Sequence, residues 1–220
     1  MFYEFPKQAA FGKTIPKKKI YEQSSPNSKI MDKFVKEVEK IIWSYKLSPD
    51  TINIPASKSV HEIQIFTIIL RTDDFSTEIL QIIDKAIPSP IIFQLYYQGK
   101  VCNYAAYKRP SEADRSKWVI SSYFGNDGFI QYQSDMKERL PIAIDMGSLY
   151  ELILKDMIPI PSRDGESLKD LVDRFETLTS KEKEAIKLES RMKKEKQFNR
   201  KVEINRSLNV LKEEIEDYKC

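Results

Sequence analysis

The last quarter of the chain contains neither proline nor glycine, and this absence constrains the fold more than any other feature. From residue 168 onward, the two residue types that interrupt helices most strongly are missing. The spacing of the apolar residues predicts one long or once-broken pair of helices, forming a helical hairpin or a coiled-coil-like tail. These residues fall in two stripes, Leu168, Leu171, Val172, Phe175 and Leu178, then Ile204, Leu208, Leu211, Ile215 and Tyr218.

A proline-flanked segment, PIPSRDGES over 159–167, separates this tail from the rest of the chain. Prolines also punctuate the first 29 residues, at positions 6, 16 and 26. We therefore expect three regions: an N-terminal arm over 1–29, an α/β core domain over 30–160 and a charged helical tail over 161–220.

Between arm and tail, the apolar pattern changes between helical and strand periodicity. It predicts helices over 28–45 and 76–87 and another beginning at Ser148, strands over 51–54, 60–71 and 91–98, and hairpin turns at Gly99 and 125–128. The strand, helix and strand over 60–98 predict a βαβ unit with parallel strands. The expected fold class is α+β: a mixed β-sheet with a βαβ unit and covering helices, followed by the long-helix tail.

The counts of chemically reactive residues exclude most conventional catalytic sites. The chain has one histidine, His61, and two cysteines, Cys102 and Cys220. A zinc site needs three or four such ligands, and no serine or cysteine stands in a nucleophile context near His61. Glycine-rich phosphate loops are also missing, since the turn after 60–71 reads TDDF. We expect no cofactor and no bound metal.

The same counts indicate the compartment. Two cysteines cannot build a disulfide framework in 220 residues, which favours a reduced, cytoplasmic setting. The N-terminus shows no signal peptide, and the longest apolar run is far shorter than the ~20 residues of a membrane span. We expect a soluble protein with no membrane partner.

One group of residues is compatible with metal-dependent catalysis. Restriction-type nucleases hold a metal between an Asp and a Glu on neighbouring strands, with a Lys two residues past the Glu. Asp50 and Glu62 fit the first two positions, but Gln64 occupies the third, and Lys58 is the nearest cation. Asp50 could equally be a turn residue, with Glu62 and Gln64 on the solvated face of a strand.

The segment RMKKEKQFNRK, 191–201, carries six positive side chains and one negative one. On a helix, Lys193, Lys196 and Arg200 share one face, with Lys194 and Lys201 beside them, so these five cations could contact phosphates. The overall charge of +3 does not identify a nucleic-acid binder. Interspersed glutamates allow the alternative of a solvated helix with pairs such as Glu189–Lys193.

Several phrases occur in an order that resembles a known family: IIWSYKLSPDTINIP, VHEIQIFTIILR, ILQIIDKAIPSPIIFQL and LESRMKKEKQFNRKVEINRSLNVLKEEIE. Over almost its whole length, the chain is similar to a prokaryotic family that carries a domain-of-unknown-function label, number 4391. The resemblance implies no catalytic residues. It implies a DNA-related accessory role, because genes of this family are met beside DNA methyltransferases and superfamily-two helicases, in what look like restriction or phage-defence cassettes.

The leading hypothesis is therefore a non-enzymatic accessory protein of a DNA-processing system that docks on a helicase or methyltransferase. Under this hypothesis, the five cations of segment 191–201 named above contact nucleic acid. Four further residues pack on the partner or on the core: Leu208, Leu211, Ile215 and Tyr218. Two alternatives stay open. One is a metal-dependent nuclease using Asp50, Glu62 and Gln64, and the other is a structural protein that forms homo-oligomers through its C-terminal helix.

Overall fold

The computed structural model describes residues 2–111, 113–114, 118–125, 128–133 and 137–219. The chain divides into two compact units, Met1–Met157 and Ile158–Cys220, called unit 1 and unit 2 below. None of the described helices combines the length and apolarity that a membrane span requires.

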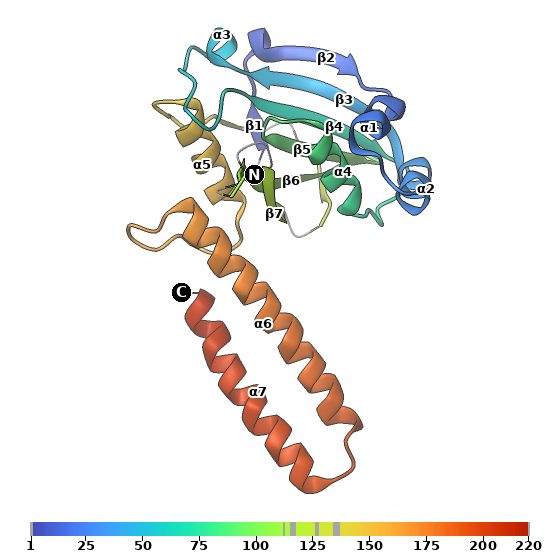
Figure 1. Cartoon of the computed structure of the whole chain (residues 1–220), viewed down its shortest axis with the longest axis vertical. Helices are drawn as coiled ribbons and strands as arrows, with labels where there is room; N and C mark the ends of the chain where they lie inside the picture. The colour runs from blue at the N-terminus through green and yellow to red at the C-terminus, as the bar shows by residue number, and fades with distance from the viewer. Residues whose placement is uncertain (1, 112, 115–117, 126–127, 134–136, 220) are drawn as a thin grey trace. The chain divides into compact units, whose positions relative to one another are not determined.

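Unit 1 is built on a mixed sheet whose strands run in the order β2-β3-β4-β5-β6-β7 (Figure 1). The short strand β8 also pairs with β6. The strands of this sheet are β2 (Ala10–Thr14), β3 (Val38–Leu47), β4 (Ile63–Leu70), β5 (Ile91–Tyr97), β6 (Lys100–Pro110), β7 (Trp118–Gly125) and β8 (Ile130–Gln131). A separate parallel pair joins β1 (Phe2–Glu4) to β9 (Lys137–Arg139). The helices are η1 (Lys7–Ala9), α1 (Lys17–Ser24), α2 (Ser28–Glu37), α3 (Pro49–Ile52), α4 (Glu78–Ala86) and α5 (Met146–Met157). The predicted α+β class is confirmed.

β4, α4 and β5 form the predicted βαβ unit. The two strands are parallel, with Gln64 opposite Ile91. One face of these strands belongs to a buried cluster that includes Phe66, Ile68, Phe93, Leu95, Ile79, Leu80 and Ile83. The alternate residues Ile63 and Ile65 point to the other face and are also fully buried. Strands covered on both faces explain the continuous apolar run in the sequence.

The helix expected over 28–45 is wrong in its second half. α2 ends at Glu37, and Val38–Leu47 is a strand that pairs with β2 on one side and β4 on the other. The three- and four-residue spacing of its apolar side chains fitted a helix. However, β-branched and aromatic residues suit a pleated surface, and the two neighbouring strands supply ladders of backbone hydrogen bonds.

The strand predicted over residues 51–54 is also wrong. Pro49–Ile52 forms the single helical turn α3, which begins after Ser48. The hydroxyl of Thr51 accepts from the backbone N of Ser48 at 2.9 Å and donates to the carbonyl of Lys46 at 2.8 Å. These side-chain bonds turn the chain after β3. Ser and Thr often bond to nearby backbone groups in this way, and such bonds compete with the backbone pairing of a strand.

The predicted turn at Gly99 is present, with Gln98 and Gly99 both at positive φ between the antiparallel β5 and β6. The second predicted hairpin is not formed, because β7 and β8 each pair with β6. Residues 126–127 of its turn lie outside the described residues. Residues expected as an arm contribute β1 and β2, and Ile20 of α1 is buried within unit 1.

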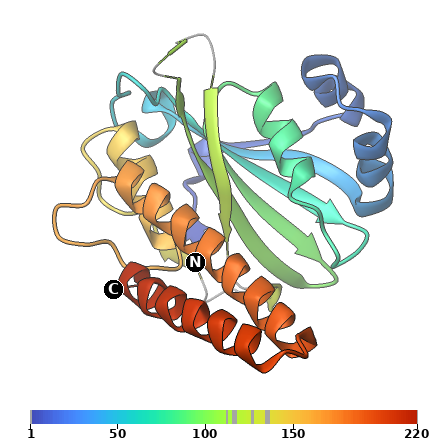
Figure 2. The ribbon, with the colours of Figure 1, turned by 60° about the horizontal axis from the view of Figure 1, so that its bottom comes forward.

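Unit 2 contains the predicted helical hairpin. Helices α6 (Leu168–Lys194) and α7 (Phe198–Lys219) run side by side and antiparallel, as Figures 1 and 2 show. Buried apolar residues of both helices form the seam between them: Leu178, Ala185, Leu208, Leu211 and Ile215. Partly exposed ion pairs between Lys181 and Glu214 at 2.6 Å and between Lys212 and Glu189 at 2.8 Å border the seam and link the two helices.

The open end of the hairpin is held by a buried arginine. Nε and Nη2 of Arg174 donate to the two carboxylate oxygens of Glu166, at 2.7 and 2.8 Å. Nη1 donates to the carbonyl of Tyr218, and Nη2 also donates to the carbonyl of Pro161, both at 2.6 Å. One guanidinium thus joins α6, α7 and the loop before α6, and its hydrogen bonds lower the pKa of Glu166 to about 2.

We predict that Arg174→Met loosens the hairpin, because it removes one partner of a buried ion pair and leaves two carbonyls without the guanidinium donor, while Glu166 retains the backbone N–H of Arg163. Such losses cost about 3 kcal/mol, which corresponds to roughly a hundredfold faster amide exchange in the C-terminal half of α7. Hydrogen exchange measures this directly. Lys187→Met, an exposed substitution on α6, should leave exchange unchanged, and equal behaviour of the two variants would contradict the role given to Arg174.

Candidate nucleic-acid interface and buried polar clusters

The hairpin brings the five candidate phosphate-binding cations together at its closed end. Lys193 and Lys194 end α6, Lys196 lies in the connecting turn, and Arg200 and Lys201 lie in the first turn of α7. All five side chains are exposed. We call this group the tip cluster. Folding concentrates these charges, because the turn places the start of α7 beside the end of α6.

Two acidic residues near the tip cluster, Glu195 and Glu189, have other hydrogen-bond or ion-pair partners. The carboxylate of Glu195 accepts from the backbone N–H groups of Lys196 and Gln197, at 2.8 and 2.9 Å. These two bonds are the main reason why the pKa of Glu195 lies below its usual range, and nearby cations add to the effect. Glu189 pairs with Lys212 of α7, so the intrahelical pair with Lys193 that the sequence suggested is not formed. Within the described residues, no ion pair engages a member of the tip cluster.

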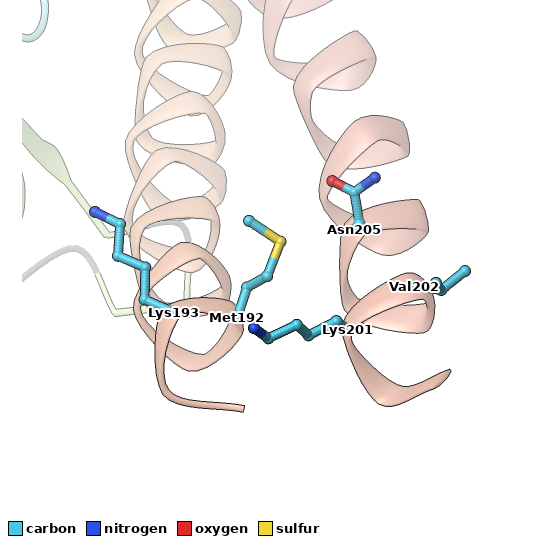
Figure 3. A pocket seen from close by; sticks show the side chains of 5 residues that line it. All are labelled: Met192, Lys193, Lys201, Val202 and Asn205. Carbon is cyan, nitrogen blue, oxygen red and sulfur yellow. The ribbon is translucent and has the colours of Figure 1, made fainter. Parts of the chain in front are cut away.

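Apolar side chains are interleaved with these cations. Phe198, at the start of α7, is 77% exposed, and Val202 is 52% exposed. An open hollow of about 450 Å³ lies at the tip (Figure 3), lined by Met192, Lys193, Lys201, Val202 and Asn205. Met192 and Lys201 point toward one another across it, whereas Lys193 points away from α7. Basic and aromatic groups in alternation are the combination with which proteins bind single-stranded nucleic acids.

Three of the four residues predicted to bind a partner are buried inside the hairpin and are not accessible on its surface. Leu208, Leu211 and Ile215 are buried in the seam against α6, and Tyr218 is half-buried, with the ammonium of Lys181 5.6 Å from its ring centre. Partner binding through these residues stays a prediction, and it would require α6 and α7 to separate. The candidate residues of the hairpin therefore fall into two groups: exposed cations at its closed end and aliphatic side chains buried between the two helices.

Glu62 and Gln64, the second pair of candidate residues, meet in unit 1. Gln64 lies on β4 and is 2% exposed, and its Nε2 donates to Oε1 of Glu62 at 2.7 Å. Oε1 also accepts from Ser89 at 3.0 Å, while Oε2 pairs with Nζ of Lys46 at 2.7 Å. Both carboxylate oxygens thus have protein partners, and the cation comes from β3 rather than from the Glu-x-Lys position.

Asp50 does not join this cluster in the described structure. It lies on the one-turn helix α3 and is exposed. Within the described residues, no group of three or more His, Cys, Asp and Glu side chains could hold a metal ion. Of the three residues in the nuclease alternative, the structure brings together only Glu62 and Gln64.

A buried ion pair, which the sequence did not suggest, lies beneath the end of α4. Lys108 of β6 and Asp84 of α4 have side chains only 1% and 2% exposed, with 3.5 Å between Nζ and Oδ1. Nζ also donates to the backbone carbonyls of Asp84 at 2.5 Å, of Ile87, and of Ser89 at 3.4 Å. The hydroxyl of Tyr123 donates to the other oxygen of Asp84.

This pair has a structural role. The ammonium of Lys108 satisfies carbonyls at and just beyond the C-terminus of α4, which intrahelical bonds leave unpaired. Burial raises the pKa of Asp84 to about 6, although Lys108 and Tyr123 oppose the shift, and burial lowers the pKa of Lys108. The only signal in the sequence is that Lys108 directly follows the largely apolar stretch YAAY, 104–107.

Comparison with known proteins identifies one family. The model of the family described as "Domain of unknown function (DUF4391)" matches residues 4–215. Neither the comparison with curated proteins nor that with solved structures found a match.

We predict that Asp84 makes the stability of unit 1 depend on pH. Its folded pKa of about 6 exceeds its ordinary 3.8, so its contribution is full below pH 3.8 and is lost as the pH rises through about 6. The difference corresponds to about 3 kcal/mol. Asp84→Asn lacks this loss, so the variant should gain about 2.5 kcal/mol relative to the wild type between pH 4 and pH 7.

Urea denaturation followed by tryptophan fluorescence measures this difference, because Trp43 and Trp118 both lie in unit 1. The exposed Asp73→Asn serves as the matched control, with a difference from the wild type that stays constant over this range. A constant difference for Asp84→Asn as well would show that Asp84 does not take up a proton near pH 6.

Proposed function

We propose that this chain, which belongs to the DUF4391 family, is a non-enzymatic accessory protein of a DNA-processing system that binds nucleic acid through the tip of its helical hairpin. The system would be of the restriction–modification or phage-defence type and cytoplasmic. The larger partner would be a DNA helicase or a DNA methyltransferase, as the gene neighbourhood implied by the family resemblance suggests.

The observation that carries the proposal is the tip cluster. Five exposed cations, four from the two helices and one from the turn between them, lie at one end of the hairpin, and no described acidic side chain forms an ion pair with them. Farther from the turn, by contrast, cations of the same helices are paired with glutamates, as Lys181 and Lys212 show. A cluster that keeps its charge unpaired favours an anionic partner, and phosphate contacts are its common use.

The two alternatives have less support in the geometry. For a metal-dependent nuclease, Asp50 lies apart on α3, and Glu62 already has Lys46, Gln64 and Ser89 as partners. Self-association through the C-terminal helix would need the buried seam to open, because α6 of the same chain covers it. Sedimentation of the full chain tests self-association, and incubation with plasmid and Mg²⁺ tests cleavage.

We predict that replacing all five tip cations by glutamine weakens binding of duplex DNA at every sequence to a similar extent. Each phosphate contact contributes about 0.9 to the slope of log K against log salt, so the magnitude of the slope should fall by up to about 4.5. Fluorescence anisotropy titrations at several salt concentrations measure both quantities, and circular dichroism verifies that the hairpin remains helical.

A matched control removes the same charge from unit 1, by glutamine at five exposed lysines: Lys7, Lys29, Lys36, Lys40 and Lys58. This variant should bind DNA with nearly the original salt slope. If the tip variant keeps its affinity at low salt, or both variants lose it equally, the nucleic-acid part of the proposal is wrong.

We also predict a role for the exposed ring of Phe198. A ring among cations can stack on an unpaired base, which is worth about 1–3 kcal/mol. Phe198→Ala should therefore lower affinity for single-stranded DNA about tenfold or more and change duplex binding little. Val210→Ala, on the same helix and 53% exposed, is the control and should bind both forms normally. Equal losses on single strands and duplex would contradict stacking.

A further inference from the structure

Unit 1 contains a cavity of about 310 Å³ between α1, β3, β4 and the C-terminal end of α4. Its walls are mainly apolar; Glu62 and Gln64 form a polar end at the start of β4, and Lys19 and Gln23 of α1 also line the cavity. This size is at the lower end of the range for small-molecule sites, so it suits one ring system rather than an extended ligand.

The walls are suited to a flat ring. The indole of Trp43 and the phenyl ring of Phe66 are neighbours on adjacent strands, with ring centres 6.1 Å apart. Ile20 of α1 and Ile87, just after α4, also line the cavity. The two rings are tilted by 55° to one another, so together with the aliphatic side chains they offer a planar ligand an apolar wall with aromatic contacts.

The polar end has hydrogen-bond acceptors without enough donors. Oε1 of Gln64 is buried and has no partner among the described residues. A carboxylate offers about four acceptor positions, and Glu62 uses three of them, on Gln64, Ser89 and Lys46. A buried amide oxygen without a donor costs free energy, so a ligand that brings N–H groups would recover that cost.

One donor in the lining shows the opposite deficit. The indole N–H of Trp43 is also buried and has no acceptor in the part of the chain that the structure describes. A ligand that complements this cavity is therefore planar, presents N–H donors along one edge and carries a ring nitrogen or carbonyl as acceptor. Nucleobases with an exocyclic amino group combine these features.

We propose that this cavity binds an amino-bearing nucleobase, with its ring against Trp43 and Phe66 and its N–H groups toward Gln64 and Glu62. Lys19 of α1 is an exposed cation of the cavity lining, and in this proposal it pairs with the phosphate of the same nucleotide. The source can be a free nucleotide or a base presented by a single strand. The inference goes beyond the proposed function and stands on residues of unit 1 alone.

The fluorescence of Trp43 provides a test, in a Trp118→Phe background that leaves it as the sole tryptophan. The full chain is titrated with GMP, AMP, CMP, UMP and ribose 5-phosphate, and separately with a short single-stranded oligonucleotide. We expect saturable quenching by GMP, AMP and CMP. UMP, which has one ring N–H and no amino group, should bind about tenfold more weakly, and ribose 5-phosphate should have no effect.

Two variants test the contacts, with near-UV circular dichroism as the check of folding. Gln64→Leu removes the buried acceptor, and Glu62→Gln, at a partly exposed position, changes the second acceptor with little risk to the core. Each should weaken nucleotide binding about tenfold. The control is Gln94→Leu, a buried glutamine of the neighbouring strand β5 on the opposite face of the sheet, which should bind normally.

Quenching by mononucleotides identifies a free nucleotide as the ligand, and quenching by the oligonucleotide alone identifies a base within a strand. The proposal is overturned if no probe quenches Trp43 up to about 1 mM, if UMP or ribose 5-phosphate acts as well as GMP, or if Gln94→Leu loses as much binding as Gln64→Leu. The variant in which all five tip cations are replaced by glutamine should bind mononucleotides as the wild type does. A failure of this inference can therefore be distinguished from a failure of the proposed DNA binding by the tip cluster.

Discussion

Pairing of β3 with β4 is the interaction on which the geometry of unit 1 depends. It turns residues that have helical spacing into a strand, and it places Trp43 opposite Phe66 and Lys46 opposite Gln64. The aromatic wall of the cavity and the ion pair of Glu62 with Lys46 both follow from this register. Since side chains alternate between the two faces of a strand, a shift of one residue would turn Gln64 away from the cavity and toward the opposite face.

A different constraint governs unit 2. Burial of one apolar seam brings α6 and α7 together, and this same contact determines which residues remain accessible. Leu208, Leu211 and Ile215 are covered, whereas the cations at the turn are left exposed with the ring of Phe198 beside them. The hairpin thus buries its aliphatic seam between the two helices and leaves a group of cations exposed at its closed end. Arg174 contributes to this order by joining the ends of both helices and the loop before α6.

The buried polar groups of unit 1 differ in whether they find all their hydrogen-bond partners within the protein. Lys108 and Asp84 satisfy one another and the end of α4, so their cluster is complete within the protein. Gln64 and Trp43 lie in a cavity wall, and each retains a buried polar atom with no partner among the described residues. Completeness distinguishes a structural polar cluster from one that favours a ligand, because the cost of an unsatisfied buried group persists until something binds.

Local patterns in the sequence were sufficient for the features that depend on neighbouring residues. The lack of proline and glycine after residue 165 and the two apolar stripes predicted the helical hairpin, and the apolar run from Ile63 with the following helix predicted the βαβ unit. The same patterns gave the basic segment 191–201 but not its unpaired state, which follows from glutamates bonded elsewhere. Only the tertiary structure decided that Val38–Leu47 is a strand, that Lys108 meets Asp84, and that Gln64, Glu62 and Trp43 share one cavity. These outcomes depend on contacts between segments far apart in the chain, and the energy of such contacts is not written in the spacing of any one segment.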